Sequence, residues 1–148
     1  MNVNAVAREA LDAARGGDRS KATELLGTLR GTDPKPALYW YAWAEVRRAE
    51  GNDELLATSL FAFSANLFGK HMEVLGFNGP GPVAADALRT LNPAHLSGKA
   101  VDADRLLKDG RYAEAIPLFR EIIDGRIALL RDGGYDVFAA GDSGAARG

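Results

Sequence analysis

Apolar and small residues recur along most of this chain at the spacing of one face of an α-helix. In the first segment they stand at Val3, Val6, Ala10 and Leu11. A stripe that returns every three or four residues predicts an amphipathic helix. The same pattern predicts helices over residues 2–15, 19–30, 37–50, 54–66, 83–91, 94–109 and 112–131, and it leaves open whether the fourth continues to about residue 75. No segment alternates between apolar and polar residues, so we predict no β-strand.

Glycine and proline separate the predicted helices. The glycines that stand between the two helices of a pair are Gly17, Gly51 and Gly110. Because glycine tolerates the left-handed backbone conformation that often follows the last helical residue, we predict a tight turn at each of them. Asp18 or Ser20 is expected to cap the helix after the first turn, and Asp53 the helix after the second.

The turns recur at a fixed interval. Gly51 lies 34 residues after Gly17, and the same offset relates two alanines, Ala10 and Ala44. A third copy is centred on Gly110, after an insertion of 25 residues beyond one period. Small and apolar residues in fixed phase over such a period are typical of a helical solenoid, in which stacked hairpins share a continuous core.

The hairpins resemble the tetratricopeptide repeat family. The third copy matches that family's turn glycine, aromatic, alanine, aromatic and apolar order with Gly110, Tyr112, Ala115, Phe119 and Ile122. The pattern departs at Val6 and Lys99, which stand where the family usually has tryptophan, and at Leu56, which stands at an alanine position. The resemblance covers about two thirds of the chain and implies antiparallel hairpins that line a protein-binding groove.

These observations predict an all-α fold of about seven helices in antiparallel hairpins. The hairpins form either a right-handed stack similar to tetratricopeptide repeats or, because of the insertion, a closed bundle. We expect one domain over residues 1–138, with a loop insertion at about 69–93, and a flexible tail over 139–148. After the last helix, only Tyr135, Val137 and Phe138 are suited to dock on the domain.

Composition narrows the class of protein. The hydrophobic fraction of 47% and the charged fraction of 26% are ordinary for a globular domain, and a net charge of -2 argues against a nucleic-acid binder. Cysteine is absent, the first residues do not form a secretory signal, and the longest uncharged stretch is too short to span a membrane. We therefore expect a cytoplasmic protein. The excess of Arg over Lys, with abundant Ala and Gly, favours a bacterial source.

Residue patterns for catalysis or cofactor binding are missing. His71 and His95 lack a second metal ligand at helical spacing, so we predict no metal site. The loop at Gly76–Pro82 contains two prolines, which remove amide donors that a phosphate would need. We predict no catalytic residues and no cofactor, and we expect the chain not to be an enzyme.

The densest aromatic patch lies within residues 39–43. Consecutive helical residues point about 100° apart, so these side chains cannot all face one core. The hairpin phase predicts that Trp40 and Trp43 pack inward. On the groove side, the predicted partner-binding residues are Tyr41, Glu45 and Arg48. Aromatic residues beside an arginine are typical of protein interfaces.

The leading hypothesis is therefore a protein-interaction module or scaffold that binds a partner segment, or its own copy, through this face. The alternative is a ligand-binding or catalytic helical domain whose pocket lies near the Gly76–Pro82 loop, His71 and Phe77. A third hypothesis is homodimerisation through the broadly apolar helix at residues 54–68.

Overall fold

The computed structural model describes residues 2–33, 35–74, 94–132 and 134–138. Over these residues the chain forms six α-helices and no strand, which confirms the predicted all-α class. The helices are α1 (Val3–Arg15), α2 (Arg19–Thr28), α3 (Ala37–Glu50), α4 (Asp53–Val74), α6 (Ala94–Lys108) and α7 (Tyr112–Asp132). Their bounds agree closely with the prediction, and the fourth helix does continue past residue 66. The helix predicted at 83–91, the loop at 76–82 and the tail at 139–148 lie outside the described residues.

The three predicted glycine turns share one geometry. The backbone φ is 89° at Gly17, 73° at Gly51 and 76° at Gly110. In the first turn the amide of Asp18 donates back to the carbonyl oxygen of Ala13 at 2.9 Å, and the other two turns repeat this bond at equivalent positions. Helices α1, α3 and α6 thus each end in a Schellman motif, in which a glycine in the left-handed conformation lets the last carbonyl groups of the helix accept hydrogen bonds.

Side-chain caps start the helices that follow the first two turns. A carboxylate oxygen of Asp18 accepts the amide of Lys21 at 3.1 Å, as predicted. After the second turn the cap is Asn52, whose side-chain oxygen accepts the amide of Leu55 at 3.1 Å. The prediction of Asp53 was wrong by one residue, because Asp53 is already helical and its neighbour is the last residue outside the helix.

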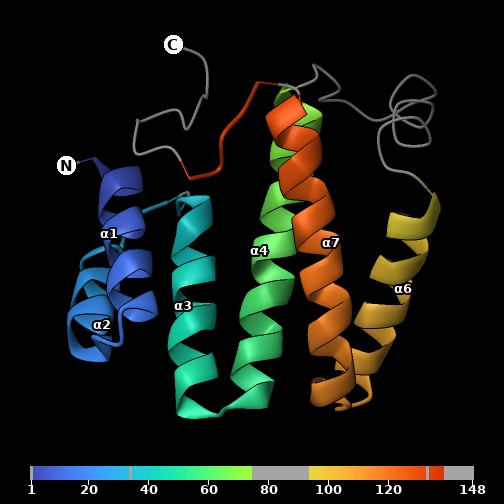
Figure 1. Ribbon diagram of the computed structural model, residues 1–148, viewed down its shortest axis with the longest axis horizontal. Coiled ribbons are helices and arrows are strands. Elements are labelled where there is room, and N and C mark those ends of the chain that lie inside the picture. Colours follow the sequence, from blue (N-terminus) through green and yellow to red (C-terminus); the bar gives the residue numbers. More distant parts are fainter. Residues whose placement is uncertain (1, 34, 75–93, 133, 139–148) are drawn as a thin grey trace.

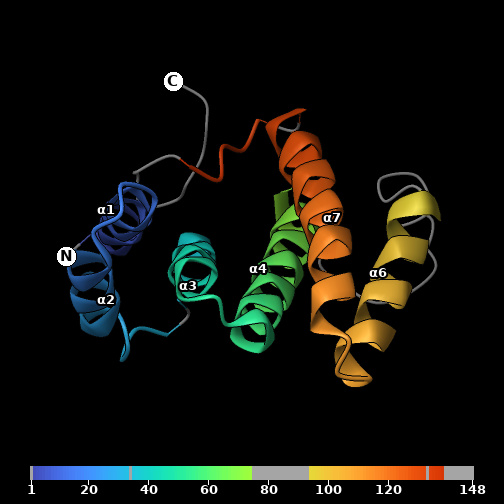
Figure 2. The same cartoon turned by 60° about the horizontal axis from the view of Figure 1, so that its bottom comes forward.

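The described helices lie side by side in an open row. From one end to the other the order is α1 with α2, then α3, α4, α7 and α6 (Figure 1). A second view gives the same order (Figure 2), and the extensive contacts run between α1 and α3, α3 and α4, and α4 and α7. The first hairpin therefore joins the second through its first helix, α1. The third hairpin joins through its second helix, α7, and leaves α6 on the outer edge.

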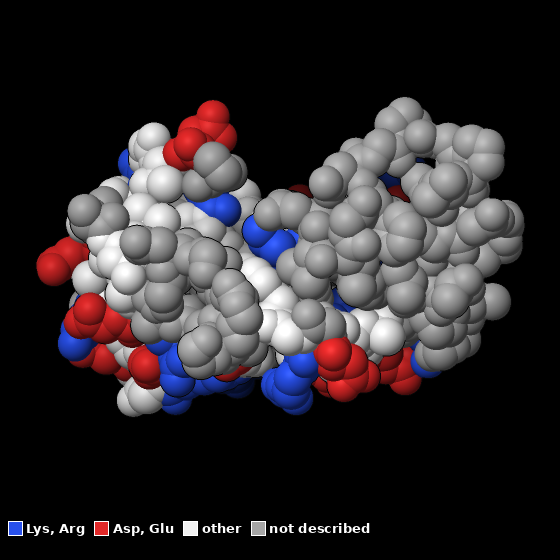
Figure 3. Space-filling model, turned by 90° about the horizontal axis from the view of Figure 1, so that it is seen from above, with Lys and Arg blue, Asp and Glu red and all other residues white. Residues whose placement is uncertain are grey.

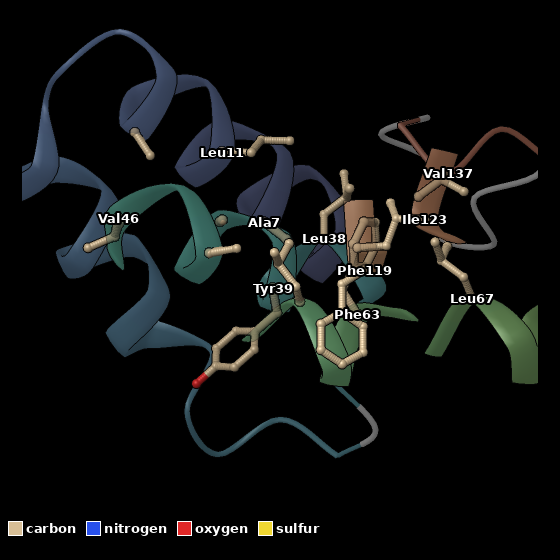
Figure 4. Close-up of a cluster of buried hydrophobic side chains, with 14 of the residues drawn as sticks. Ala7, Leu11, Leu38, Tyr39, Val46, Phe63, Leu67, Phe119, Ile123 and Val137 are labelled. Atoms are coloured by element: carbon tan, nitrogen blue, oxygen red, sulfur yellow. The ribbon is translucent and has the colours of Figure 1, made fainter. Parts of the chain in front are cut away.

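Small side chains let α1 and α3 approach closely, while larger ones fill the space around α4. The alanines at positions 7, 10, 42 and 44 are fully buried. Phe63 and Leu67 of α4 are also fully buried, and Figure 4 shows them with Phe119 and Ile123 of α7. The central position predicted for the fourth helix is confirmed. It is nevertheless not covered all round, because Leu55 and Phe61 stay exposed.

Candidate functional site

A short segment returns from the end of α7 to the first two hairpins. We call residues 134–138 the strap. It begins at Gly134, where φ is 88°, and the amide of Tyr135 donates to the carbonyl oxygen of Leu130 at 2.9 Å. The strap then crosses towards α1 and α3 (Figure 1). The predicted docking of Tyr135, Val137 and Phe138 is confirmed, since all three pack against the core.

The strap is held by its side chains at successive points. The amino group of Lys70, on α4, lies 5.4 Å from the centre of the Tyr135 ring. Val137 is only 5% exposed and lies at the edge of the core, towards Leu67 and Ile123 in the view of Figure 4. Val137 is therefore the main apolar anchor of the strap.

Phe138 ends the described strap between α1 and α3. The guanidinium carbon of Arg15 lies 5.9 Å from the Phe138 ring centre and 5.0 Å from the Tyr41 ring centre. The two rings are 6.2 Å apart. Arg8 also donates a hydrogen bond to the carbonyl oxygen of Phe138. Two arginines of α1 and one tyrosine of α3 thus hold both the ring and the backbone of one residue.

The ring of Tyr41 is held in position by Phe63 of α4. Its ring stacks on that of Phe63, with centres 4.6 Å apart and planes 14° from parallel. Phe63 is fully buried between neighbouring helices, so the Tyr41 ring has a fixed support. We define the strap face as the side chains of Arg8, Arg15, Tyr41 and Phe63.

The three residues predicted to bind a partner have different surroundings. Tyr41 belongs to the strap face and is half-buried. Glu45 is only 7% exposed, and its carboxylate accepts hydrogen bonds from Arg48 at 3.1 and 3.3 Å. The structure therefore brings Tyr41 against a chain segment, while Glu45 and Arg48 engage each other. Partner binding by all three residues stays a prediction.

The predicted inward packing of Trp40 and Trp43 is met only in part, because both pack against the core without becoming buried. Both side chains are half-buried and line an open pocket of about 360 Å³ between α3 and α4. Tyr39 is the aromatic residue of this turn that becomes buried. The buried side of α3 otherwise contains small and aliphatic residues, among them Ala42, Ala44 and Val46.

This second site is apolar with a charged edge. We call it the tryptophan pocket, and its main lining residues are Trp40, Trp43, Arg47, Leu55, Phe61 and Ala62. Arg47 lies over the Trp43 ring at 4.4 Å and pairs with Glu50 at 2.8 Å. Leu55 is 40% exposed and Phe61 39%. They are two of the three large apolar residues that the described part of the chain leaves exposed.

A buried arginine ties α4 to α7, and sequence reasoning missed it. Arg126 is 6% exposed and donates to the carbonyl oxygen of Ser64 at 2.9 Å and to its hydroxyl at 2.7 Å. Its guanidinium also lies over the Phe68 ring, and burial lowers the pKa of Arg126. The available signal was its place in an apolar stripe, four residues after Ile122 and four before Leu130. Its contacts describe a link between two helices.

Within the part of the chain that the structure describes, no three His, Cys, Asp or Glu side chains lie close enough to hold a metal ion. None of the described helices combines the length and apolar character needed to cross a membrane. The alternative pocket near Gly76–Pro82 and Phe77 lies outside the described residues, as does the side chain of His71. No family model, curated protein or solved structure matches this chain.

Proposed function

We propose that this chain is a non-catalytic protein-interaction module that holds an extended partner segment on the strap face. One observation carries the proposal: this surface already holds a residue of a non-helical segment, Phe138 of the strap, through its backbone carbonyl group and its ring. A face that binds a segment of its own chain offers the same contacts to another.

The chemistry of the strap face suits an extended peptide. Arg8 offers a charged donor to a backbone carbonyl group, and this contact does not depend on the identity of the side chain. Arg15 and Tyr41 together form a site for an aromatic ring. Since Tyr41 rests on Phe63, the site loses little side-chain freedom on binding, which favours affinity.

A repeat arrangement similar to tetratricopeptide hairpins is part of the same proposal. The equivalent turns at Gly17, Gly51 and Gly110 support it, because each joins two antiparallel helices with the same backbone geometry. The third hairpin packs on the second through α7. The proposed stack is therefore regular over the first two hairpins and changes its mode of packing at the third.

The test uses the full chain as bait and measures by mass spectrometry which proteins it retains from its native host. The variants Tyr41→Ala and Arg15→Ala remove the ring site, and we expect each to lose the retained partner. Trp43→Ala is the matched control, because it removes an aromatic residue from the same helix but outside the strap face. A partner retained equally by all variants would contradict the proposal.

A second candidate function is self-association through the tryptophan pocket. It is favoured by the exposure of Leu55 and Phe61 at the edge of the tryptophan pocket. In a dimer with two-fold symmetry, an exposed apolar side chain of each copy can fill the pocket of the other. Phe61→Glu should then lower the mass measured by light scattering at high concentration. A strict monomer for the unaltered chain would remove this candidate.

A further inference from the structure

We infer that the strap is a built-in competitor for the strap face, and that the partner segment replacing it presents an acidic, an aliphatic and an aromatic residue in succession, as Asp136–Phe138 does. This inference rests on the proposed function. It adds the chemistry of the partner and the expectation that the strap weakens the binding of that partner.

The first step is that the strap is bound as a ligand would be bound. It lies outside the six described helices, and it begins at a glycine in the left-handed conformation, which can act as a hinge. The backbone of the strap meets the helices where the amide of Tyr135 bonds to the end of α7 and where the carbonyl oxygen of Phe138 accepts a hydrogen bond from Arg8. Its other contacts described above are made by side chains. It can therefore leave without breaking any helix.

The second step is that Val137 and Phe138 contact the helices, while Asp136 shapes the strap between them and Tyr135. Val137 fills an apolar position at the edge of the core, and the ring of Phe138 enters the site formed by Arg15 and Tyr41. A carboxylate oxygen of Asp136 accepts the amide of Phe138 at 3.0 Å, which shapes the backbone for both side chains. The aliphatic and aromatic positions thus follow from contacts with the helices, and the acidic position from the backbone bond that it makes within the strap.

The third step is charge. The strap passes Lys70 on α4 and then Arg15 and Arg8 on α1, so three cations line its path. Seen from above, Lys and Arg side chains but few Asp and Glu side chains are visible in the middle of this end of the molecule, whereas both charges occur along its edges (Figure 3). A partner segment with an acidic residue is therefore favoured over a basic one.

The fourth step is competition. A tethered segment acts at an effective concentration on the order of millimolar, which an outside peptide must overcome. The apparent affinity of the outside peptide is reduced by the fraction of molecules whose site is open. Opening the strap should therefore strengthen binding of an outside peptide by at least about tenfold.

The experiment measures binding of a labelled peptide to the full chain by fluorescence anisotropy. The peptide has the sequence of residues 134–138, Gly-Tyr-Asp-Val-Phe, with both ends blocked. We expect its Kd for the double variant Val137→Ala, Phe138→Ala to be at least about tenfold lower than for the unaltered chain. Phe61→Ala, a matched aromatic deletion outside the strap face, should leave the Kd unchanged.

Two further peptides test the recognition order. Replacing the aspartate by lysine and replacing the phenylalanine by alanine should each weaken binding to the opened chain. Adding Tyr41→Ala to the opened chain should abolish the preference for phenylalanine, because the ring then loses one wall of its site. If all the peptides bind equally, the inferred partner chemistry is wrong.

A second measurement needs no substitution. Saturating the unaltered chain with peptide should increase amide hydrogen exchange in residues 135–138, because the strap is displaced. If exchange is unchanged at saturation, or if the opened and unaltered chains have the same Kd, the strap does not compete with the peptide for the strap face. If the peptide binds to none of the variants, the inference is wrong as well. The proposed function is tested separately, by the retention of partner proteins by the Tyr41→Ala variant.

Discussion

The two aromatic faces of α3 are built from neighbouring residues but have opposite surroundings. Tyr41 stacks on Phe63, the Arg15 guanidinium lies over its ring, and the Phe138 ring of the strap lies 6.2 Å away. Trp40 and Trp43 also have an arginine nearby, yet they line an open pocket. The same pairing of aromatic residue and arginine therefore gives a covered face on one side of the helix and an uncovered face on the other.

Helix α4 repeats this contrast with two phenylalanines. Phe63 supports Tyr41 and is fully buried, whereas Phe61 is 39% exposed at the edge of the tryptophan pocket. Residues two apart on a helix point about 200° apart, so one helix contributes to both sites with opposite sides. The comparison teaches that the residue type does not decide burial here. What decides it is how far neighbouring elements cover each side of the helix: Phe63 is enclosed by its neighbours, whereas Phe61 stays at the edge of a pocket.

The largest expected effect separates these two phenylalanines. Phe63→Ala leaves a cavity under Tyr41 and should lower the free energy of unfolding by about 3–5 kcal/mol. Phe61→Ala removes a side chain that is 39% exposed and whose ring meets that of Phe119 edge-on at 6.0 Å, so it should cost only about 1–2 kcal/mol. Urea denaturation of both variants gives the two values. Similar losses would show that the two faces are equally covered in solution.

The anchor of the strap should give the next largest effect. Val137→Ala deletes the equivalent of two buried methylene groups, so we expect a loss of about 1–2 kcal/mol in the free energy of unfolding. The matched control is Val101→Ala, since Val101 is 57% exposed, and it should change stability by less than about 0.5 kcal/mol. If the two variants lose the same free energy of unfolding, Val137 is not buried in solution and the strap does not cover the strap face.

The helices and turns of this fold were predictable because their signals are local. Gly17, Gly51 and Gly110 mark turns through a conformation that glycine adopts without strain, and the flanking stripes fix the helical segments. The suitability of Val137 and Phe138 for docking was also visible, as apolar residues in a polar stretch. Each of these predictions depends on residues that are close in the sequence.

The orientation of the tryptophans and the destination of the strap were not predictable. Both depend on which helices become neighbours, and the contact of Arg8 with Phe138 joins residues 130 positions apart. The hairpin phase predicted that Trp40 and Trp43 pack inward, and it gave no sign that both would stay half-buried at an open pocket. In the structure the third hairpin packs through α7, and no described helix covers that side of the tryptophan pocket.

A smaller effect compares the cation–aromatic contacts of the two faces. Double-mutant cycles with alanine should give a coupling energy of about 0.5–1 kcal/mol for Arg15 with Phe138, and a similar value for Arg47 with Trp43. The expected difference lies in their dependence on the strap. Adding Val137→Ala should remove the coupling of the first pair and leave the second intact. Loss of both couplings would mean that the two faces are not independent.

The smallest expected effect is an unchanged tryptophan fluorescence of the chain when the strap is opened. Both tryptophans of the chain line the open pocket, so its tryptophan emission reports on that face alone. Because the side chains are half-buried, acrylamide should quench this emission to an intermediate degree. Opening the strap with Val137→Ala and Phe138→Ala should leave both emission and quenching unchanged, since the strap touches the other side of α3. A shift in emission would show that the covered face and the open face are coupled through the helix.

Reduced quenching at high protein concentration would instead indicate that a second copy covers the tryptophan pocket.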